Sequence, residues 1–247
     1  MIALFVRYLP LLLIAAAWQI ASSLQLVSTL ALPPLSDVAV AWWDLLKSGE
    51  LITNGASSLW RAGAGLFLSI IIGATVGIAM AWWRPAQIVL GPLVEALYPL
   101  PKSALIPVTV IWLGFGDGSK ILLILLGCML PIAIGAYNGA RGSDQALVWT
   151  ARSMGASRLR MLWDVVVPSA TPELLNGIRT ALALSFILLV SSELIVARSG
   201  LGYLIGALGS DGSYSAMYAV VLTVAFIGFA ADRAYQLLQN RMLRWQQ

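Results

Sequence analysis

Two ionisable side chains, Lys102 and Glu193, stand in stretches that are otherwise apolar enough to lie in a lipid bilayer. A charge at that depth is costly, and membrane proteins keep one mainly where it lines a polar route or pairs with another group. Lys102 is therefore a candidate for the path of a small anion, and Ser191, Ser192 and Glu193 are further path candidates. Two alternatives stay open. Lys102 could reach the membrane surface or pair with Glu95, and Glu193 could brace helices through hydrogen bonds.

The sequence lacks the residues that common catalytic sites require. It has no histidine and one cysteine, which excludes a serine–histidine hydrolase and a cysteine-based metal site. No GxxxxGK[ST] phosphate loop occurs. The run Gly114–Asp117 matches the GxGD pattern of intramembrane aspartyl proteases, but no second aspartate is evident within a membrane span. We therefore expect no catalytic residue, cofactor-binding residue, metal ligand or enzyme activity in this chain.

The composition predicts an integral membrane protein of the all-α class. Of the 247 residues, 60% are hydrophobic and 11% are charged, whereas soluble domains carry about 25% charged residues. So few polar side chains cannot cover a surface that faces water. The net charge of +4 is spread over short loops, which indicates membrane orientation and no nucleic-acid partner.

Six stretches are long and apolar enough to cross a bilayer as helices, which requires about 20 residues each. They are residues 8–27, 62–83, 87–113, 119–139, 175–197 and 215–236. We expect the first to be retained rather than cleaved as a signal peptide. The predicted parts are an N-terminal helix with an outer interfacial segment (1–61), a core (62–240) and a tail (241–247). Proline interrupts the third stretch at 99, 101 and 107, around Lys102.

The distribution of lysine and arginine predicts that both termini lie in the cytoplasm. With that orientation, the inner segments hold Arg7, Arg84, Arg141, Arg152, Arg158, Arg160, Arg233, Arg241 and Arg244, and the outer segments hold Lys47, Arg61, Lys120 and Arg198. Positive residues concentrate on the inner side of membrane proteins.

One compact polar segment lies between the fourth and fifth spans, in the predicted loop 141–172. Residues 149–172 read WTARSMGASRLRMLWDVVVPSATP. Gly155 interrupts a helix–turn–helix pattern, and we expect Pro168 to end it. A membrane protein would bind a cytoplasmic partner through a basic, exposed segment of this kind.

This segment resembles the EAA loop of ABC-importer permease subunits. That loop reads E-A-A, three residues, Gly, nine residues, an aliphatic residue, one residue and then Leu-Pro. Here Trp149, Thr150 and Ala151 stand for E-A-A, followed by Gly155, Val165 and Val167-Pro168. Trp149 and Thr150 depart from the pattern, so the resemblance does not imply for this chain the polar contact that the family glutamate makes.

Further segments resemble the nitrate/sulfonate/taurine branch of that family, from about residue 33 to the C-terminus. They are 57–77, 92–116, 174–184 with Glu193, 200–203 and 232–245. The resemblance implies a type I importer permease core of the bacterial inner membrane. It also implies a transported solute that is small and anionic, such as a sulfonate, taurine or nitrate.

The resemblance implies several partners. Two permease chains, which we expect to be identical, would form the path, and two cytoplasmic ATPase subunits would hydrolyse ATP. A periplasmic or lipoprotein solute-binding protein would deliver the solute. The residues expected to couple to the ATPase are Trp149, Thr150, Ala151, Gly155, Ala156, Leu162 and Pro168. Small residues at 151, 155 and 156 would allow close approach, and Leu162 would supply apolar area. The alternatives are an ion-coupled secondary transporter that works without an ATPase and a purely structural membrane subunit.

Overall fold

The computed structural model describes the backbone of residues 2–244 and the side chains of residues 9–244, and this part of the chain contains helices and no strands. In chain order the helices are α1 (Ile2–Ser23), α2 (Leu35–Lys47), α3 (Glu50–Trp82), α4 (Arg84–Leu97), η1 (Lys102–Leu105), α5 (Ile106–Leu113), α6 (Asp117–Arg141), α7 (Gln145–Ser153), α8 (Arg158–Met161), η2 (Leu162–Val166), α9 (Val167–Val196), α10 (Leu201–Ser210) and α11 (Tyr214–Met242). The predicted all-α class is confirmed.

Four described helices are long and apolar enough to cross a membrane, namely α3, α6, α11 and the continuous helix Arg158–Val196. They match the second, fourth, sixth and fifth predicted spans, of which the second and fifth extend one residue beyond the helix end. α3 begins at Glu50, well before the predicted start at residue 62. The first predicted span, 8–27, runs four residues past the end of α1 at Ser23, and the described apolar part of α1, Leu9–Ser23, is shorter than the other spans. Residues 245–247 of the predicted tail lie outside the described residues.

The third predicted span, 87–113, is not one helix. Arg84–Leu97 and Lys102–Leu113 meet at an angle of 99°, so this region is a broken span or a re-entrant loop. The physical reason is the run of prolines. Pro99 and Pro101 have no N–H to donate, and their rings also push the preceding residues out of the helical conformation.

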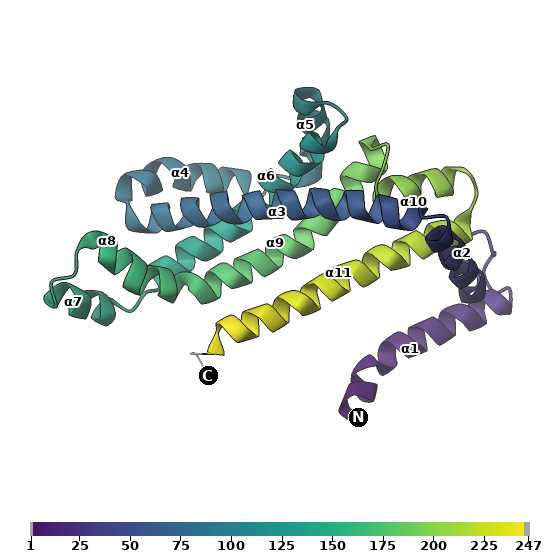
Figure 1. The fold of residues 1–247 in the computed structure, drawn as a ribbon, viewed down its shortest axis with the longest axis horizontal. Helices are drawn as coiled ribbons and strands as arrows, with labels where there is room; N and C mark the ends of the chain where they lie inside the picture. The colour runs from purple at the N-terminus through teal and green to yellow at the C-terminus, as the bar shows by residue number, and fades with distance from the viewer. Residues whose placement is uncertain (1, 245–247) are drawn as a thin grey trace.

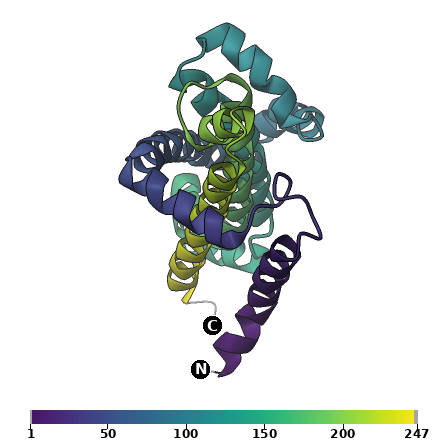
Figure 2. The same ribbon diagram turned by 90° about the vertical axis from the view of Figure 1, so that its right-hand side faces the viewer.

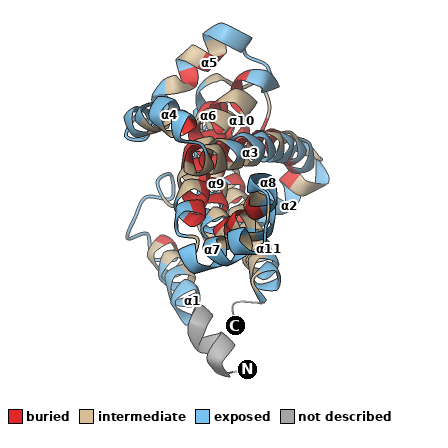
Figure 3. Cartoon of the chain, turned by 90° about the vertical axis from the view of Figure 1, so that its left-hand side faces the viewer, coloured by how far each residue is buried: buried red, intermediate tan, exposed pale blue. Residues whose placement is uncertain are grey.

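The core is a layer of three helices in which α6 lies between α3 and α9. Figure 3 shows the buried residues concentrated in this layer. Glycine permits the contact on both sides of α6. A Cβ atom at Gly77 of α3 would come within 2.3 Å of the Ala133 carbonyl oxygen, and one at Gly139 of α6 within 2.7 Å of the Ala170 carbonyl oxygen. Both small-residue spacings, at 73/77 and 135/139, therefore serve packing within this chain.

The two ends of the bundle carry different elements (Figure 1). α7 and α8 lie at one end, and α2 and α10 lie at the opposite end. Figure 2 shows that α1 stands apart from the bundle. Its C-terminal part is tied to the segment before α2, because the Trp18 indole N–H donates to the Pro33 carbonyl oxygen at 2.9 Å. The Trp18 ring also contacts the edge of Tyr218 on α11.

Candidate functional site

The predicted helix–turn–helix segment forms, and its turn is built around Gly155. Asp144 begins α7 by accepting a hydrogen bond from the N–H of Ala146 at 2.8 Å. At the other end, Gly155 adopts a φ of +79° and donates to the Arg152 carbonyl, and Ala156 donates to the Ala151 carbonyl, both at 3.0 Å. This pair of bonds is a Schellman motif, in which glycine is favoured because its φ is positive.

Beyond the turn, the helical segment does not end at Pro168. Ser157 caps α8, and a continuous helix then runs from Arg158 to Val196. Leu162–Val166 form one π-helical turn, closed by the N–H of Val167 donating to the carbonyl of Leu162. Pro168 cannot donate to the carbonyl of residue 164, and its ring would clash there. The wide turn accommodates this proline, which becomes part of the first turn of α9. The prediction that Pro168 ends the segment is therefore wrong.

The segment from α7 to η2, which we call the coupling segment, exposes large apolar side chains. The exposed fractions are 82% for Met154, 67% for Trp149, 66% for Leu159 and 62% for Trp163. Leu162 instead packs inward against Val166 and Ala170 and anchors the segment to the bundle. The Thr150 hydroxyl donates to the Ala146 carbonyl of its own helix at 2.8 Å. Ala151 and Ala156 are half-buried, and Gly155 is exposed.

Lys102 lies at the 99° bend, where its ammonium group is hydrogen-bonded within the chain. The ammonium group donates to the carbonyl oxygens of Leu97, Tyr98 and Leu100, each at 2.8 Å. Leu97 and Tyr98 are the last residue and the C-cap of α4, and a cation at a helix C-terminus is stabilised. The open pairing of Lys102 with Glu95 does not form.

Glu193 lies in a buried cluster at the α10 end of the bundle. Its side chain is fully buried and accepts hydrogen bonds from the Arg61 guanidinium at 2.7 Å and from the Ser58 hydroxyl at 2.7 Å. The N–H of Gly202 donates to the same carboxylate at 3.0 Å. This geometry favours the bracing alternative, because the carboxylate joins α3, α9 and α10. Ser192 is also buried and bonds to its own helix.

Arg61, which the sequence assigned only to an outer segment, is the centre of this cluster. It also pairs with Asp117 at 2.8 Å and donates to the carbonyl and the hydroxyl of Ser199. Lys120 is likewise buried and donates to the carbonyls of Phe115 and Gly116. Arg61 directly precedes the second predicted span and Glu193 lies near the end of the fifth, so two opposite charges at these span ends were the available signal for the pair.

A second ion pair that the sequence did not indicate joins α9 to α11. The Arg179 guanidinium contacts both carboxylate oxygens of Asp232, at 2.8 and 3.2 Å. Close by, the Tyr235 hydroxyl donates to the Leu175 carbonyl at 2.7 Å. Ser191 lies farther along α9 and lines a cavity of about 530 Å³ between the same two helices.

Comparison with known proteins identifies the family. The model of the binding-protein-dependent transport system inner membrane component matches residues 65–244. The taurine transport system permease protein TauC of Escherichia coli K12 is 36% identical over 92% of this chain and 85% of its own length. The putative aliphatic sulfonates transport permease protein SsuC of Bacillus subtilis 168 is 32% identical over 94% of this chain and 84% of its own length.

Solved structures agree on the fold. A chain of the MetNI methionine ABC transporter, in an inward-facing conformation, superposes with a TM-score of 0.68, covering 79% of this chain and 97% of that one at 21% identity. The family match spans α6, the coupling segment and all of α9 to α11. The chain therefore belongs to the family of binding-protein-dependent transport system inner membrane components, the permease subunits of ABC importers.

Proposed function

We propose that two copies of this chain form the membrane path of an ATP-driven importer for a small sulfonate-like solute. Two cytoplasmic ATPase subunits would bind the coupling segments, and a solute-binding protein would deliver the solute from outside. The relatives named for taurine and aliphatic sulfonates support the choice of solute class. The observation that carries the proposal is the coupling segment, which exposes apolar side chains at one end of the bundle.

The connection of this segment to the bundle supports its role in transmitting movement. α8, η2 and α9 form one continuous helix of 39 residues, so a displacement of the coupling segment is passed along α9. α9 packs closely on α6 at Gly139 and is joined to α3 through Glu193. Closure of an ATPase pair on ATP binding would therefore reorient the path without any catalytic residue in this chain.

The test replaces Gly155 with Asp in the complex reconstituted with its ATPase and binding protein. The positive φ and the acidic side chain both disfavour the docked turn, so we expect solute-stimulated ATP hydrolysis and uptake to fall together. Gly212→Asp is the matched control, because Gly212 also has a positive φ and open space around its Cα but lies at the opposite end. Parent-level activity in Gly155→Asp would refute the docking assignment.

The same preparation decides between an ABC permease and an ion-coupled transporter. Vesicles that contain this chain alone should show no uptake, with or without an ion gradient. Uptake in the absence of the ATPase subunits would establish the secondary-transport alternative and overturn the proposal.

A further inference from the structure

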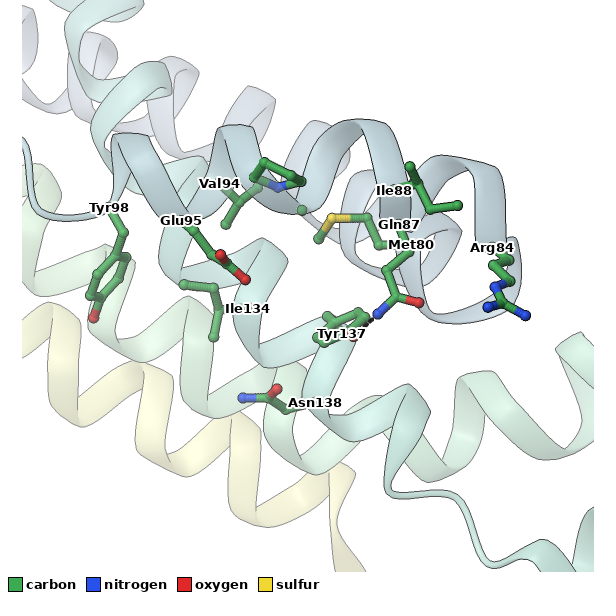
Figure 4. A pocket seen from close by; sticks show the side chains of 12 residues that line it. Met80, Arg84, Gln87, Ile88, Val94, Glu95, Tyr98, Ile134, Tyr137 and Asn138 are labelled. Atoms are coloured by element: carbon green, nitrogen blue, oxygen red, sulfur yellow. Dashed lines mark hydrogen bonds between the residues drawn. The ribbon is translucent and has the colours of Figure 1, made fainter.

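A groove lined by both polar and apolar side chains opens between α3, α4 and α6, with a volume of about 690 Å³ (Figure 4). Its polar side chains are Arg84, Gln87, Glu95, Tyr98, Tyr137 and Asn138. Figure 4 shows Glu95 and Tyr98 extending from α4 and Asn138 from α6. The groove is therefore bounded by helices of the core layer and by the first arm of the broken span.

Several of these groups have no partner within the described chain. The Gln87 amide donates to the Tyr137 hydroxyl at 2.7 Å, and Arg141 donates to the same hydroxyl at 2.8 Å. By contrast, the Glu95 carboxylate and the Asn138 amide make no hydrogen bond or ion pair to another described residue, and neither does the Tyr98 hydroxyl. The groove thus offers one acceptor with negative charge and two neutral groups that can donate.

The depth of Glu95 indicates what the groove faces. α4 begins at Arg84, and Glu95 follows 11 residues later, which is about 16 Å along a helix axis. Glu95 also lies within the third predicted span, 87–113, so we expect the carboxylate to lie inside the hydrocarbon core, which is about 30 Å thick. A carboxylate that faced lipid there would cost about 2.5–3.5 kcal/mol. The groove must therefore face water or the second copy of the chain, as the wall of a solute path does.

We propose that this groove is the inner part of the solute path and that Glu95 binds the ammonium group of a zwitterionic aminosulfonate. The carboxylate accepts hydrogen bonds from the ammonium, while the Tyr98 hydroxyl and the Asn138 amide donate to sulfonate oxygens. Lys102, the nearest cation along the chain, already donates to three carbonyls and leaves Glu95 uncompensated. Arg84 at the inner end of the groove attracts the sulfonate toward the cytoplasm. This inference rests on the proposed function and narrows its solute class.

The experiment compares uptake of labelled 2-aminoethanesulfonate and labelled ethanesulfonate by the full complex in vesicles. The variants are the parent, Glu95→Gln, Glu95→Asp and Glu50→Gln, the last being a control because Glu50 is an exposed carboxylate outside the groove. The loss of one charge-assisted hydrogen bond should lower aminosulfonate uptake by Glu95→Gln about tenfold or more. Uptake of ethanesulfonate should be unchanged or faster. Glu95→Asp should restore much of the aminosulfonate uptake, and Glu50→Gln should match the parent.

The same binding protein serves every variant. A change in the ratio of aminosulfonate uptake to ethanesulfonate uptake therefore reports on the permease. An unchanged ratio in Glu95→Gln, an equal loss for both solutes, or a parent that imports only ethanesulfonate would overturn the assignment of Glu95 while the importer function stands. Failure of the parent complex to import either solute with ATP, despite intact assembly, would instead refute the proposed function and the inference with it.

Discussion

At the scale of single residues, the Arg61–Glu193 pair is the feature on which the α10 end of the bundle depends. Both side chains are withdrawn from solvent, and their remaining hydrogen-bonding atoms are used by Ser58, Ser199 and Gly202. Two buried ions in contact add little net stability over apolar residues, but removal of one leaves the other without compensation. The cluster therefore fixes how α3, α9 and α10 meet, and loss of one member is expected to be severe.

We predict that Glu193→Ala lowers the free energy of unfolding by about 3–5 kcal/mol, because it leaves the Arg61 guanidinium buried without its inner partner. Asp117→Ala should cost about 1 kcal/mol or less, since the carboxylate of Asp117 is half exposed and screened by water. Thermal unfolding in detergent, followed by circular dichroism, measures both. Equal losses for the two variants would contradict the bracing role of Glu193.

The sequence indicated this chemistry only in part. It marked Glu193 and Lys102 as charges inside apolar stretches, and both side chains make hydrogen bonds within the chain. It could not show that Lys102 would bond to the carbonyls at the end of α4, because those acceptors exist only after the chain has bent. Arg61 was counted as an outer charge because its partners are 56 and 132 residues away along the chain.

At the scale of elements, the π-helical turn before Pro168 sets the rotation of the coupling segment about α9. One extra residue in a turn rotates everything before it by about 100° relative to a regular α-helix. We predict that Pro168→Ala allows a regular helix and turns the exposed face of α8 away from its docking partner. The complex should then hydrolyse ATP with fewer solute molecules imported per ATP.

The measurement is the ratio of uptake to ATP hydrolysis in reconstituted vesicles. Pro172→Ala is the control, because Pro172 lies one turn farther along α9, beyond the π-helical turn. A ratio that stays at the parent value in Pro168→Ala would show that the rotation set by this turn does not matter for coupling.

Elements were predictable where local chemistry decides them. The glycine turn at 155 and the apolar lengths of α6, α9 and α11 follow from the residues themselves. The start of α3 was missed because Glu50 and Asn54 in its first turns resemble a loop, although Asn54 is satisfied by accepting from the N–H of Gly200. The prolines at 99 and 101 predicted a break but not its 99° angle, which depends on packing against α6.

At the scale of the whole molecule, the orientation in the membrane is a prediction that single cysteines can test. Cys128 is buried and is the chain's one cysteine, so Cys128→Ser gives a background without thiols. In that background, cysteine at Asp211 should react with an impermeant thiol reagent applied outside intact cells. Cysteine at Met154 should react only after the membrane is opened, because the coupling segment lies at the opposite end. The reverse labelling pattern would contradict cytoplasmic termini.

The contacts of this chain with lipid and with other subunits were the feature least predictable from its sequence. α1 stands apart from the bundle, and α11 keeps most of its apolar surface uncovered within one chain. The partners of such surfaces are lipid or another subunit, and neither is encoded in the periodicity of one chain. Small-residue spacings could not decide between packing within the chain and dimerisation, and the structure shows the former.

The glycine contacts along α6 have a mechanical consequence. Where backbone atoms of neighbouring helices touch, no long side chain is available to change rotamer and absorb a displacement. We therefore expect α3, α6 and α9 to move as one rigid unit when the proposed ATPase subunits displace the coupling segment. Under the proposed mechanism, we expect flexibility to be concentrated in the proline-rich bend at residues 98–105, and we expect this bend to open and close the solute path.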